Sequence, residues 1–239
     1  MGYRKSIIRR REQAEGGDYV AKKYRAIRQK ARRVLEKKRE KIWRSKFTIA
    51  PIIYRAQNDN PRDVRTFLFD TSHILETYIK YYNLKGVDDE DTMYRILVFV
   101  INHLDYVGDE TSKGQLEFWQ NPEDTIITMK GDCEDGAILI KSLALVAGIP
   151  DWKVKIIAGM VVGGGHAYCT YIRHDETQVI LDWCYWPNKK QLHERPDRSR
   201  EPNYYLNVWF SFDKRYGYAP RPVEYTNNMI TNTKFKIGG

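Results

Sequence analysis

Cys133 is the residue whose surroundings best suit a nucleophile. It lies in the segment Gly-Asp-Cys-Glu-Asp-Gly, residues 131–136, directly before a mostly apolar stretch. Asp132 is a helix-capping residue type, so this pattern predicts Cys133 in the first turn of a helix, where N–H groups and the helix dipole stabilise a thiolate. Glu134 and Asp135 act in the opposite direction, because nearby negative charge raises the pKa of a thiol. A nucleophilic role for Cys133 therefore requires a base close by.

His166 is the candidate base. It follows three glycines and begins a segment rich in β-branched and aromatic residues, and Asp182 lies in a second such segment. If the two segments form a hairpin that turns near His174, residues 166 and 182 lie roughly opposite, and such cross-strand neighbours are about 5 Å apart. Asp182 would then orient the imidazole toward Cys133. The alternative is that each residue has only a structural role, as most single histidines and aspartates on strands do.

The secondary structure that must position these residues is predicted to change from helices to strands along the chain. Apolar residues at helical spacing predict four helices in the first part of the body, the first extending to Tyr82 and the last to about Ala147. Their expected starts are Asn60-Pro61, Asp91, Asn121-Pro122 and Asp132. Later segments predict strands over 153–162, 166–173, 178–184 and 204–212. Helices first and antiparallel strands afterwards indicate an α+β domain.

The charge of the chain is unevenly distributed. The 239 residues include 40 Lys and Arg against 31 Asp and Glu, a net charge of +9. Residues 1–47 hold 18 basic and 5 acidic residues, whereas residues 48–239 hold 22 and 26. We therefore expect a basic arm (1–47), a mildly acidic body (48–225) and a loosely ordered tail (226–239).

The arm is predicted to be helical from Asp18 to about Lys46. A narrow apolar seam recurs at spacings of four and three residues and is formed by Val20, Tyr24, Ile27, Ala31 and Val34. A cationic rod of this kind suits docking on the subunits of a larger assembly, contact with nucleic acid, or both. The alternative is a solvated helix that merely packs on the body.

Several classes of protein are disfavoured by the sequence. No apolar run approaches the length of a membrane span, and no apolar segment follows the basic start as a secretory signal requires. The three cysteines, Cys133, Cys169 and Cys184, form neither a disulfide framework nor a zinc-binding spacing. We expect reduced thiols, no membrane partner, and a cytoplasmic or virion location without export by a signal peptide.

A family resemblance adds to this picture. Residues 118–125, Phe-Trp-Gln-Asn-Pro-Glu-Asp-Thr, precede the Gly-Asp-Cys-Glu-Asp run, and Gly165-His166-Ala167 and Leu181-Asp182 follow. This combination resembles the bacterial transglutaminase-like cysteine proteinases over roughly half of the chain. The resemblance implies a papain-like α+β fold with Cys133 as nucleophile, His166 as base and Asp182 as orienting residue.

The resemblance also suggests how an ion and an oxyanion would be bound. Some members of the family bind calcium through acidic residues around the nucleophile, which here are Asp132, Glu134 and Asp135; no other cofactor is required. The alternative is that these residues only cap the helix and complement its dipole. The backbone N–H of Cys133 is the expected oxyanion donor, with the Trp119 indole or the Gln120 amide as the second.

Two functional hypotheses follow. The first is a cysteine hydrolase or acyltransferase that acts on a peptide or amide bond of a protein substrate through an acyl-thioester at Cys133 and is held in a larger assembly by its arm. The second is a structural bacteriophage virion component, from the head, neck or tail, that keeps the fold with reduced or no activity. The residues 133, 166 and 182 favour the first, whereas the arm and the missing export signal favour the second. A pure nucleic-acid-binding module would leave the acidic body unexplained.

Overall fold

A computed structural model describes residues 2–50, 54–57, 60–115, 117–200 and 204–219, without the side chains of 2–20, 54–57 and 60–61. The chain divides into two compact units, Met1–Lys46 and Phe47–Gly239. The tail expected at 226–239 lies outside the described residues. Within the described residues, no helix combines the length and the apolar character needed to cross a membrane.

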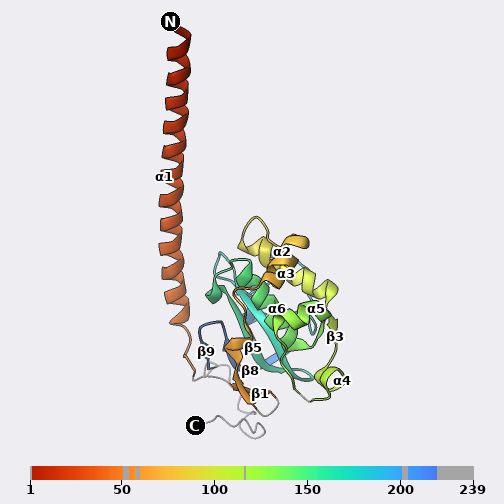
Figure 1. Cartoon of the computed structure of the whole chain (residues 1–239). Coiled ribbons are helices and arrows are strands. Elements are labelled where there is room, and N and C mark those ends of the chain that lie inside the picture. The colour runs from red at the N-terminus through yellow and green to blue at the C-terminus, as the bar shows by residue number, and fades with distance from the viewer. Residues whose placement is uncertain (1, 51–53, 58–59, 116, 201–203, 220–239) are drawn as a thin grey trace. The chain divides into compact units, whose positions relative to one another are not determined.

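The first unit is a single long helix, α1, Gly2–Arg44 (Figure 1). The predicted start at Asp18 is wrong, because the helix already includes the residues before it. Gly16 and Gly17 lie inside this helix, and a glycine there costs only about 1 kcal/mol relative to alanine. The flanking residues are mostly arginine, glutamate, glutamine and alanine, which are strong helix formers and outweigh that cost.

The second unit is built on a five-stranded antiparallel sheet in the order β7-β6-β5-β8-β9. The predicted strands are confirmed with small shifts at their ends, and β9 was not predicted. Their bounds are β5 Val154–Val161, β6 Gly164–Ile172, β7 Gln178–Leu181, β8 Tyr205–Phe212 and β9 Gly217–Tyr218. Two smaller pairs accompany this sheet: β1 Tyr54–Gln57 with β2 Asn60–Asp63, and β3 Asp105–Tyr106 with β4 Lys130–Gly131.

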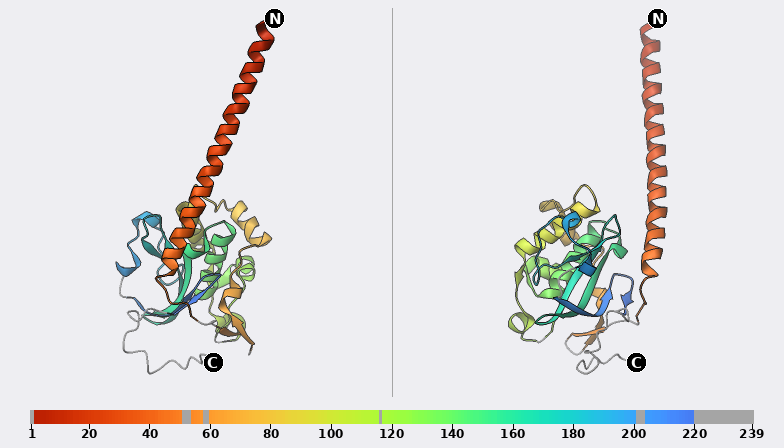
Figure 2. Two further views of the ribbon diagram at one scale, coloured as in Figure 1. Left: turned by 90° about the vertical axis from the view of Figure 1, so that its left-hand side faces the viewer. Right: turned by 180° about the vertical axis from the view of Figure 1, so that it is seen from behind.

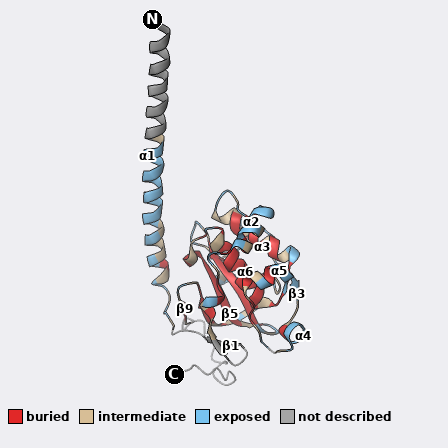
Figure 3. Cartoon of the chain, in the orientation of Figure 1, coloured by how far each residue is buried: buried red, intermediate tan, exposed pale blue. Residues whose placement is uncertain are grey.

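The helices gather around α6, Cys133–Val146, whose residues are almost all buried (Figures 1 and 3). This helix packs on β5 and β6 and also contacts α2, α3 and α5; the further views show these helices grouped beside the sheet (Figure 2). Their bounds are α2 His73–Tyr81, α3 Asp89–His103, α4 Asp109–Lys113 and α5 Pro122–Thr128. Single 3-10 turns occupy Val64–Phe67, Asp151–Lys153, Leu192–Glu194 and Arg198–Arg200. The observed order, helices and then antiparallel strands, confirms the α+β class.

Two predicted helix starts are corrected. Asn60 and Pro61 belong to β2, and the segment to Tyr82 is divided into a 3-10 turn capped by Asp63 and the helix α2 capped by Ser72. Asp91 does not cap α3: its N–H is bound by the Asp88 side chain, 2.9 Å away, so Asp88 is the cap. In both cases a second acid or hydroxyl residue near the expected cap takes that role, and local composition does not rank such neighbours.

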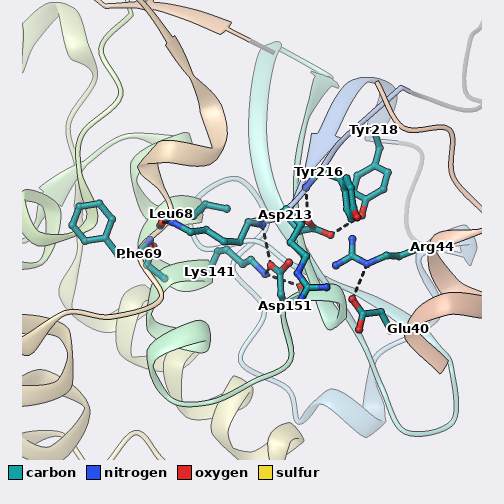
Figure 4. Close-up of polar contacts among 12 residues, drawn as sticks. Glu40, Arg44, Leu68, Phe69, Lys141, Asp151, Asp213, Tyr216 and Tyr218 are labelled. Atoms are coloured by element: carbon teal, nitrogen blue, oxygen red, sulfur yellow. Dashed lines mark hydrogen bonds and ion pairs between the residues drawn. The ribbon is translucent and has the colours of Figure 1, made fainter. Parts of the chain in front are cut away.

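The second half of α6 is anchored by buried polar contacts (Figure 4). The fully buried Lys141 donates from Nζ to the backbone oxygen and to Oδ1 of Asp151, both at 2.7 Å. Ser142 accepts a hydrogen bond from the Phe69 N–H at 3.1 Å. A charge this deep requires a close partner, and here the pair joins the helix to the turn before β5. These contacts fix the helix whose first residue is Cys133.

Candidate active site

Cys133 is the first residue of α6, as predicted, and Asp132 is the residue in the N-cap position. The Asp132 N–H donates to Oδ2 of Asp135 at 3.3 Å. The carbonyl of Cys133 accepts from the Trp183 indole N–H at 3.4 Å. Trp183 approaches this closely because Gly136 has no side chain; a Cβ there would collide with the indole ring. The residue after Asp182 therefore fixes the start of the helix.

His166 and Asp182 form a buried pair. Nε2 of His166 lies 2.7 Å from Oδ2 of Asp182, and the two residues are 7% and 1% exposed. The expected register is corrected, because β7 ends at Leu181, which pairs with Cys169. Continuing this register would place Asp182 opposite Tyr168, so His166 and Asp182 are diagonal rather than direct neighbours. Their side chains still meet, since long side chains reach diagonal positions.

The Asp182 carboxylate is surrounded by donors. Oδ1 accepts from the backbone N–H groups of Cys184 and Tyr185 at 3.2 and 3.1 Å. Oδ2 accepts from the Tyr205 hydroxyl at 2.8 Å in addition to His166. Cys184 lies close enough to His166 and Asp182 for the three side chains to bind a metal ion together. The Asp182 carboxylate, however, already accepts hydrogen bonds from the donors named above. This cluster therefore suits orientation of an imidazole and does not suit a metal.

Tyr205 is a site residue that sequence reasoning missed. It lies at the start of β8, and its ring packs 4.8 Å from that of Tyr168, which in turn stacks on His166 at 5.9 Å. Tyr185 lies 5.2 Å from the His166 ring on another side. A tyrosine in a strand has no distinguishing sequence signal, because many strand tyrosines only pack.

The Cys133 thiol lies near the residue that follows His166. The backbone N–H of Ala167 acts to lower the pKa of this thiol. Because β7 ends opposite Cys169, the edge of β6 at His166 and Ala167 has no β7 partner, and α6 packs on β6. Asp182 holds Nε2 of His166, which leaves Nδ1 as the ring nitrogen for a proton of the thiol. The described contacts thus bring the three predicted residues into one region.

The thiol is held in its neutral form in this arrangement. Burial raises the pKa of Cys133 well above its ordinary value, and the charges of Glu134 and Asp132 raise it further. The thiol donates to Oε2 of Glu134 at 3.1 Å. The opposing influence of Glu134 that the sequence predicts is therefore a direct contact, and neutralising this carboxylate would favour the thiolate.

A cluster of carboxylates lies behind the cysteine. Ligand atoms of Asp109, Asp132 and Asp135 all lie within 4.8 Å of one another, and those of Asp132, Cys133 and Glu134 form a second such group. Burial raises the pKa of Asp132 to about 7 and that of Asp135 to about 6, and it raises that of Glu134 well above its ordinary range. Three buried oxygens have no hydrogen-bond partner among the described residues: Asp109 Oδ1, Asp132 Oδ1 and Glu134 Oε1.

These oxygens fit a hard divalent cation such as calcium. Unpartnered buried carboxylates are costly, and calcium prefers several carboxylate oxygens as ligands. Asp109, at the start of α4, was not predicted as part of this group. It lies more than twenty residues before Asp132 in the sequence, and only the pairing of β3 with β4 brings the two regions together.

The two side chains predicted as oxyanion donors are engaged elsewhere. The Gln120 amide donates to the Asp135 carboxylate and to the Lys130 carbonyl, the latter at 3.3 Å. The Trp119 indole donates to Oε1 of Glu117 at 2.9 Å. Gln120 also donates its backbone N–H to Asp135 at 2.8 Å, so its role in this structure is to hold Asp135 in place.

A pocket of about 510 Å³ opens beside His166. One wall is the β5–β6 turn with Gly163, Gly164 and Gly165, and the opposite wall comes from α3 and the segment after it. The side chains that line it are mainly apolar or aromatic: Ile101, Leu104, Tyr106, Trp183 and Tyr185. Gly163 and Gly164 have φ values of 113° and 151°, which residues with side chains rarely adopt. This wall of the pocket is therefore formed by backbone at these two positions.

Comparison with known proteins shows what part of the body is similar to. Residues 77–192 match the family model of a transglutaminase-like domain. None of the curated proteins matches the sequence at a significant level. Among solved structures, LapG of Legionella pneumophila is 19% identical, with a TM-score of 0.47 over 61% of this chain and 74% of that chain. Its calcium-bound form is also 19% identical, with a TM-score of 0.47 over 65% and 78% of the two chains.

A protein described as a TGase is 12% identical, with a TM-score of 0.36 over 54% of this chain and 35% of that chain. The family match begins in α2 and ends shortly after β7, so it includes Cys133, His166 and Asp182. Over residues 77–192, about half of its length, the chain is therefore similar to a transglutaminase-like domain.

Proposed function

We propose that this domain is a cysteine hydrolase that cleaves a peptide or amide bond through an acyl-thioester at Cys133. The observation that carries the proposal is the buried His166–Asp182 pair, and the backbone N–H of the neighbouring Ala167 acts to lower the pKa of the Cys133 thiol. A histidine oriented by a carboxylate and adjacent to a cysteine at a helix N-terminus is the arrangement that activates a thiol.

In the proposed reaction, Nδ1 of His166 accepts the thiol proton while Asp182 stabilises the imidazolium through Nε2. The thiolate attacks the substrate carbonyl carbon, and the backbone N–H of Cys133 at the start of α6 stabilises the oxyanion. His166 then protonates the leaving amine, and the acyl group remains on sulfur. Water attacks the thioester to release the acid and regenerate the thiol; an amine in place of water would give acyl transfer.

The pocket beside His166 is the proposed site for a substrate side chain. Its lining is apolar and aromatic apart from His166, so an apolar side chain next to the scissile bond fits it best. Trp183 and His166 both line the pocket and belong to the proposed machinery, so we expect a side chain bound there to lie beside the reacting carbonyl.

We further propose that calcium binds at Asp109, Asp132, Glu134 and Asp135. A bound cation supplies positive charge that neutralises these carboxylates. With its charge neutralised, Glu134 would no longer hold the thiol of Cys133 in its neutral form. His166 could then accept the thiol proton as described above. The proposal rests on the three unpartnered buried oxygens of this cluster.

The rate of alkylation of Cys133 by iodoacetamide near neutral pH, measured residue by residue by mass spectrometry in the presence of calcium, tests the proposal. We expect rapid labelling of Cys133 and at least about a tenfold loss of rate in His166→Ala, because the base is removed. His174→Ala, at the exposed end of β6, is the matched control and should label at the original rate. Equal rates in the two histidine variants would contradict the proposal.

A purely structural role remains the second hypothesis, with the domain as an inactive subunit of a larger particle. Packing alone does not require an imidazole held by a carboxylate that accepts three further donors. We therefore retain the enzyme as the proposed function. Labelling of Cys133 no faster than that of a model thiol would favour the structural role.

A further inference from the structure

The helix α1 carries a density of charge that the proposed hydrolase does not use. Residues 21–46, whose side chains are described, contain 13 Lys and Arg and only two acids, Glu36 and Glu40. Arg39 pairs with Glu36 at 3.7 Å and Arg44 with Glu40 at 2.9 Å. Residues 22–33 hold seven cations and no carboxylate, and every one of them is exposed.

The seven cations form one continuous surface, which we name the cationic face: Lys22, Lys23, Arg25, Arg28, Lys30, Arg32 and Arg33. At 100° per residue they cover an arc of about 220° of the helix. The remaining arc carries Tyr24, Ile27, Ala31 and Val34, which we name the apolar stripe. Cations therefore lie on both flanks of the helix and on the side between them.

Like charges are also placed where they repel one another along the helix. Lys22, Arg25, Arg28 and Arg32 follow at spacings of three, three and four residues, so each lies next to the following one. Such pairs destabilise an isolated helix, because like charges at these spacings repel one another. A polyanion on the cationic face would reverse that effect, because it pairs with several of these side chains at once.

The diameter of the helix distinguishes double-stranded DNA from double-stranded RNA as a binding partner. An α-helix with its side chains is about 10–12 Å across and fits the major groove of B-form DNA, which is about 12 Å wide. Cations on both flanks then face the phosphates of both strands. The major groove of A-form RNA is too narrow and deep for the same approach. The helical part of this segment, residues 21–44, is about 36 Å long, close to one turn of the duplex.

We propose that the cationic face of α1 binds the phosphate backbone of double-stranded DNA, with the helix in the major groove and without sequence preference. The body, with a net charge of −4 over residues 48–239, does not compete for the phosphates. DNA would thus hold the domain in place, and this role is independent of the chemistry at Cys133.

The test is the affinity of the full chain for a fluorescent 24-base-pair duplex of arbitrary sequence, measured by anisotropy between 50 and 300 mM salt. We expect log Kd to change steeply with log salt, with a slope of about 5 or more, as release of counterions from about six phosphates requires. Replacing all seven cations by glutamine should weaken binding at least about 100-fold at 100 mM salt and flatten the slope. Glutamine keeps the helix propensity, and circular dichroism of the variant checks it.

The matched control changes the apolar stripe by Tyr24→Gln, Ile27→Gln and Val34→Gln and leaves every charge in place. It should bind DNA within about threefold of the original chain. Undiminished binding by the seven-glutamine variant would overturn the proposal, and so would equal affinity for an RNA duplex of the same sequence. Binding to phosphatidylserine vesicles that the stripe variant loses, together with no binding to DNA, would assign the helix to membranes instead. Labelling of Cys133 in the seven-glutamine variant separates this result from the proposed hydrolase.

Discussion

Two carboxylate environments in the candidate site differ in whether their oxygens have hydrogen-bond partners. Asp182 accepts from two backbone N–H groups, a tyrosine hydroxyl and an imidazole nitrogen. Asp132 and Glu134 are also buried, yet each has an oxygen without a hydrogen-bond partner among the described residues. The first group is complete within the chain, whereas the second requires a proton or a cation.

This difference assigns distinct roles to similar side chains. A carboxylate fixed by several donors keeps its charge and its position, so it can orient a histidine. A carboxylate with an unpartnered oxygen has a raised pKa and responds to its surroundings. We infer that the Asp182 side of the site supplies geometry and that the Glu134 side controls when the thiol is reactive.

The largest expected effect on the alkylation rate of Cys133 comes from changing Asp182, the carboxylate whose hydrogen bonds are all made within the chain. Asp182→Asn removes the charge that stabilises the imidazolium and should lower the alkylation rate of Cys133 at least about 100-fold. Asp175→Asn, in the exposed turn of the same hairpin, is the matched control and should keep the original rate. Thermal unfolding of both variants checks the fold. A rate in Asp182→Asn close to that of the control would remove Asp182 from the mechanism.

A change at Glu134, which has an unpartnered oxygen, should raise the alkylation rate of Cys133 instead of lowering it. In chelator, Glu134→Gln removes a negative charge and the acceptor of the thiol hydrogen bond, so the pKa of Cys133 falls and the pH midpoint of alkylation moves to lower pH. At a fixed pH below both midpoints we expect about a tenfold faster rate, which corresponds to one pH unit. Adding calcium should raise the alkylation rate of Cys133 in the original chain but change the rate in the variant much less.

Glu110→Gln, on the exposed side of α4, is the control for the loss of one acid near the site. It should leave both the midpoint and the calcium response unchanged. If the original chain responds to neither calcium nor chelator, the cluster holds no cation that matters for the thiol. An unshifted midpoint in Glu134→Gln would mean that this carboxylate does not control Cys133.

The sequence predicts the parts of this site that depend on local signals. Cys133 at a helix start follows from Asp132 and the apolar run behind it, and the strands follow from their β-branched and aromatic composition. His166 and Asp182 meet although the predicted register was displaced, because a hairpin of this length brings diagonal and direct neighbours within reach of long side chains.

The remaining parts depend on contacts between distant segments. Asp109 joins the acidic cluster through the pairing of β3 with β4, and Tyr205 reaches Asp182 from a strand on the far side of β5. The side-chain amide of Gln120 faces Asp135 rather than the sulfur, which only the packing of that segment determines. None of these contacts leaves a periodic or capping pattern in the sequence.

The smallest expected effect concerns the support of Asp182. Tyr205→Phe keeps the ring that packs on Tyr168 and removes one of the donors to Oδ2, so the carboxylate retains its two backbone N–H groups and His166. We expect the alkylation rate of Cys133 to fall about three- to tenfold, as the loss of one hydrogen bond of about 1 kcal/mol allows. Tyr185→Phe is the matched control, because that hydroxyl donates to the Val162 carbonyl at 2.9 Å although its ring also contacts His166. An unchanged rate in Tyr205→Phe would show that this tyrosine acts by packing alone, and equal losses in both variants would show that the bond to Asp182 has no specific effect. A loss confined to Tyr205→Phe would show that the donors around Asp182 set its function.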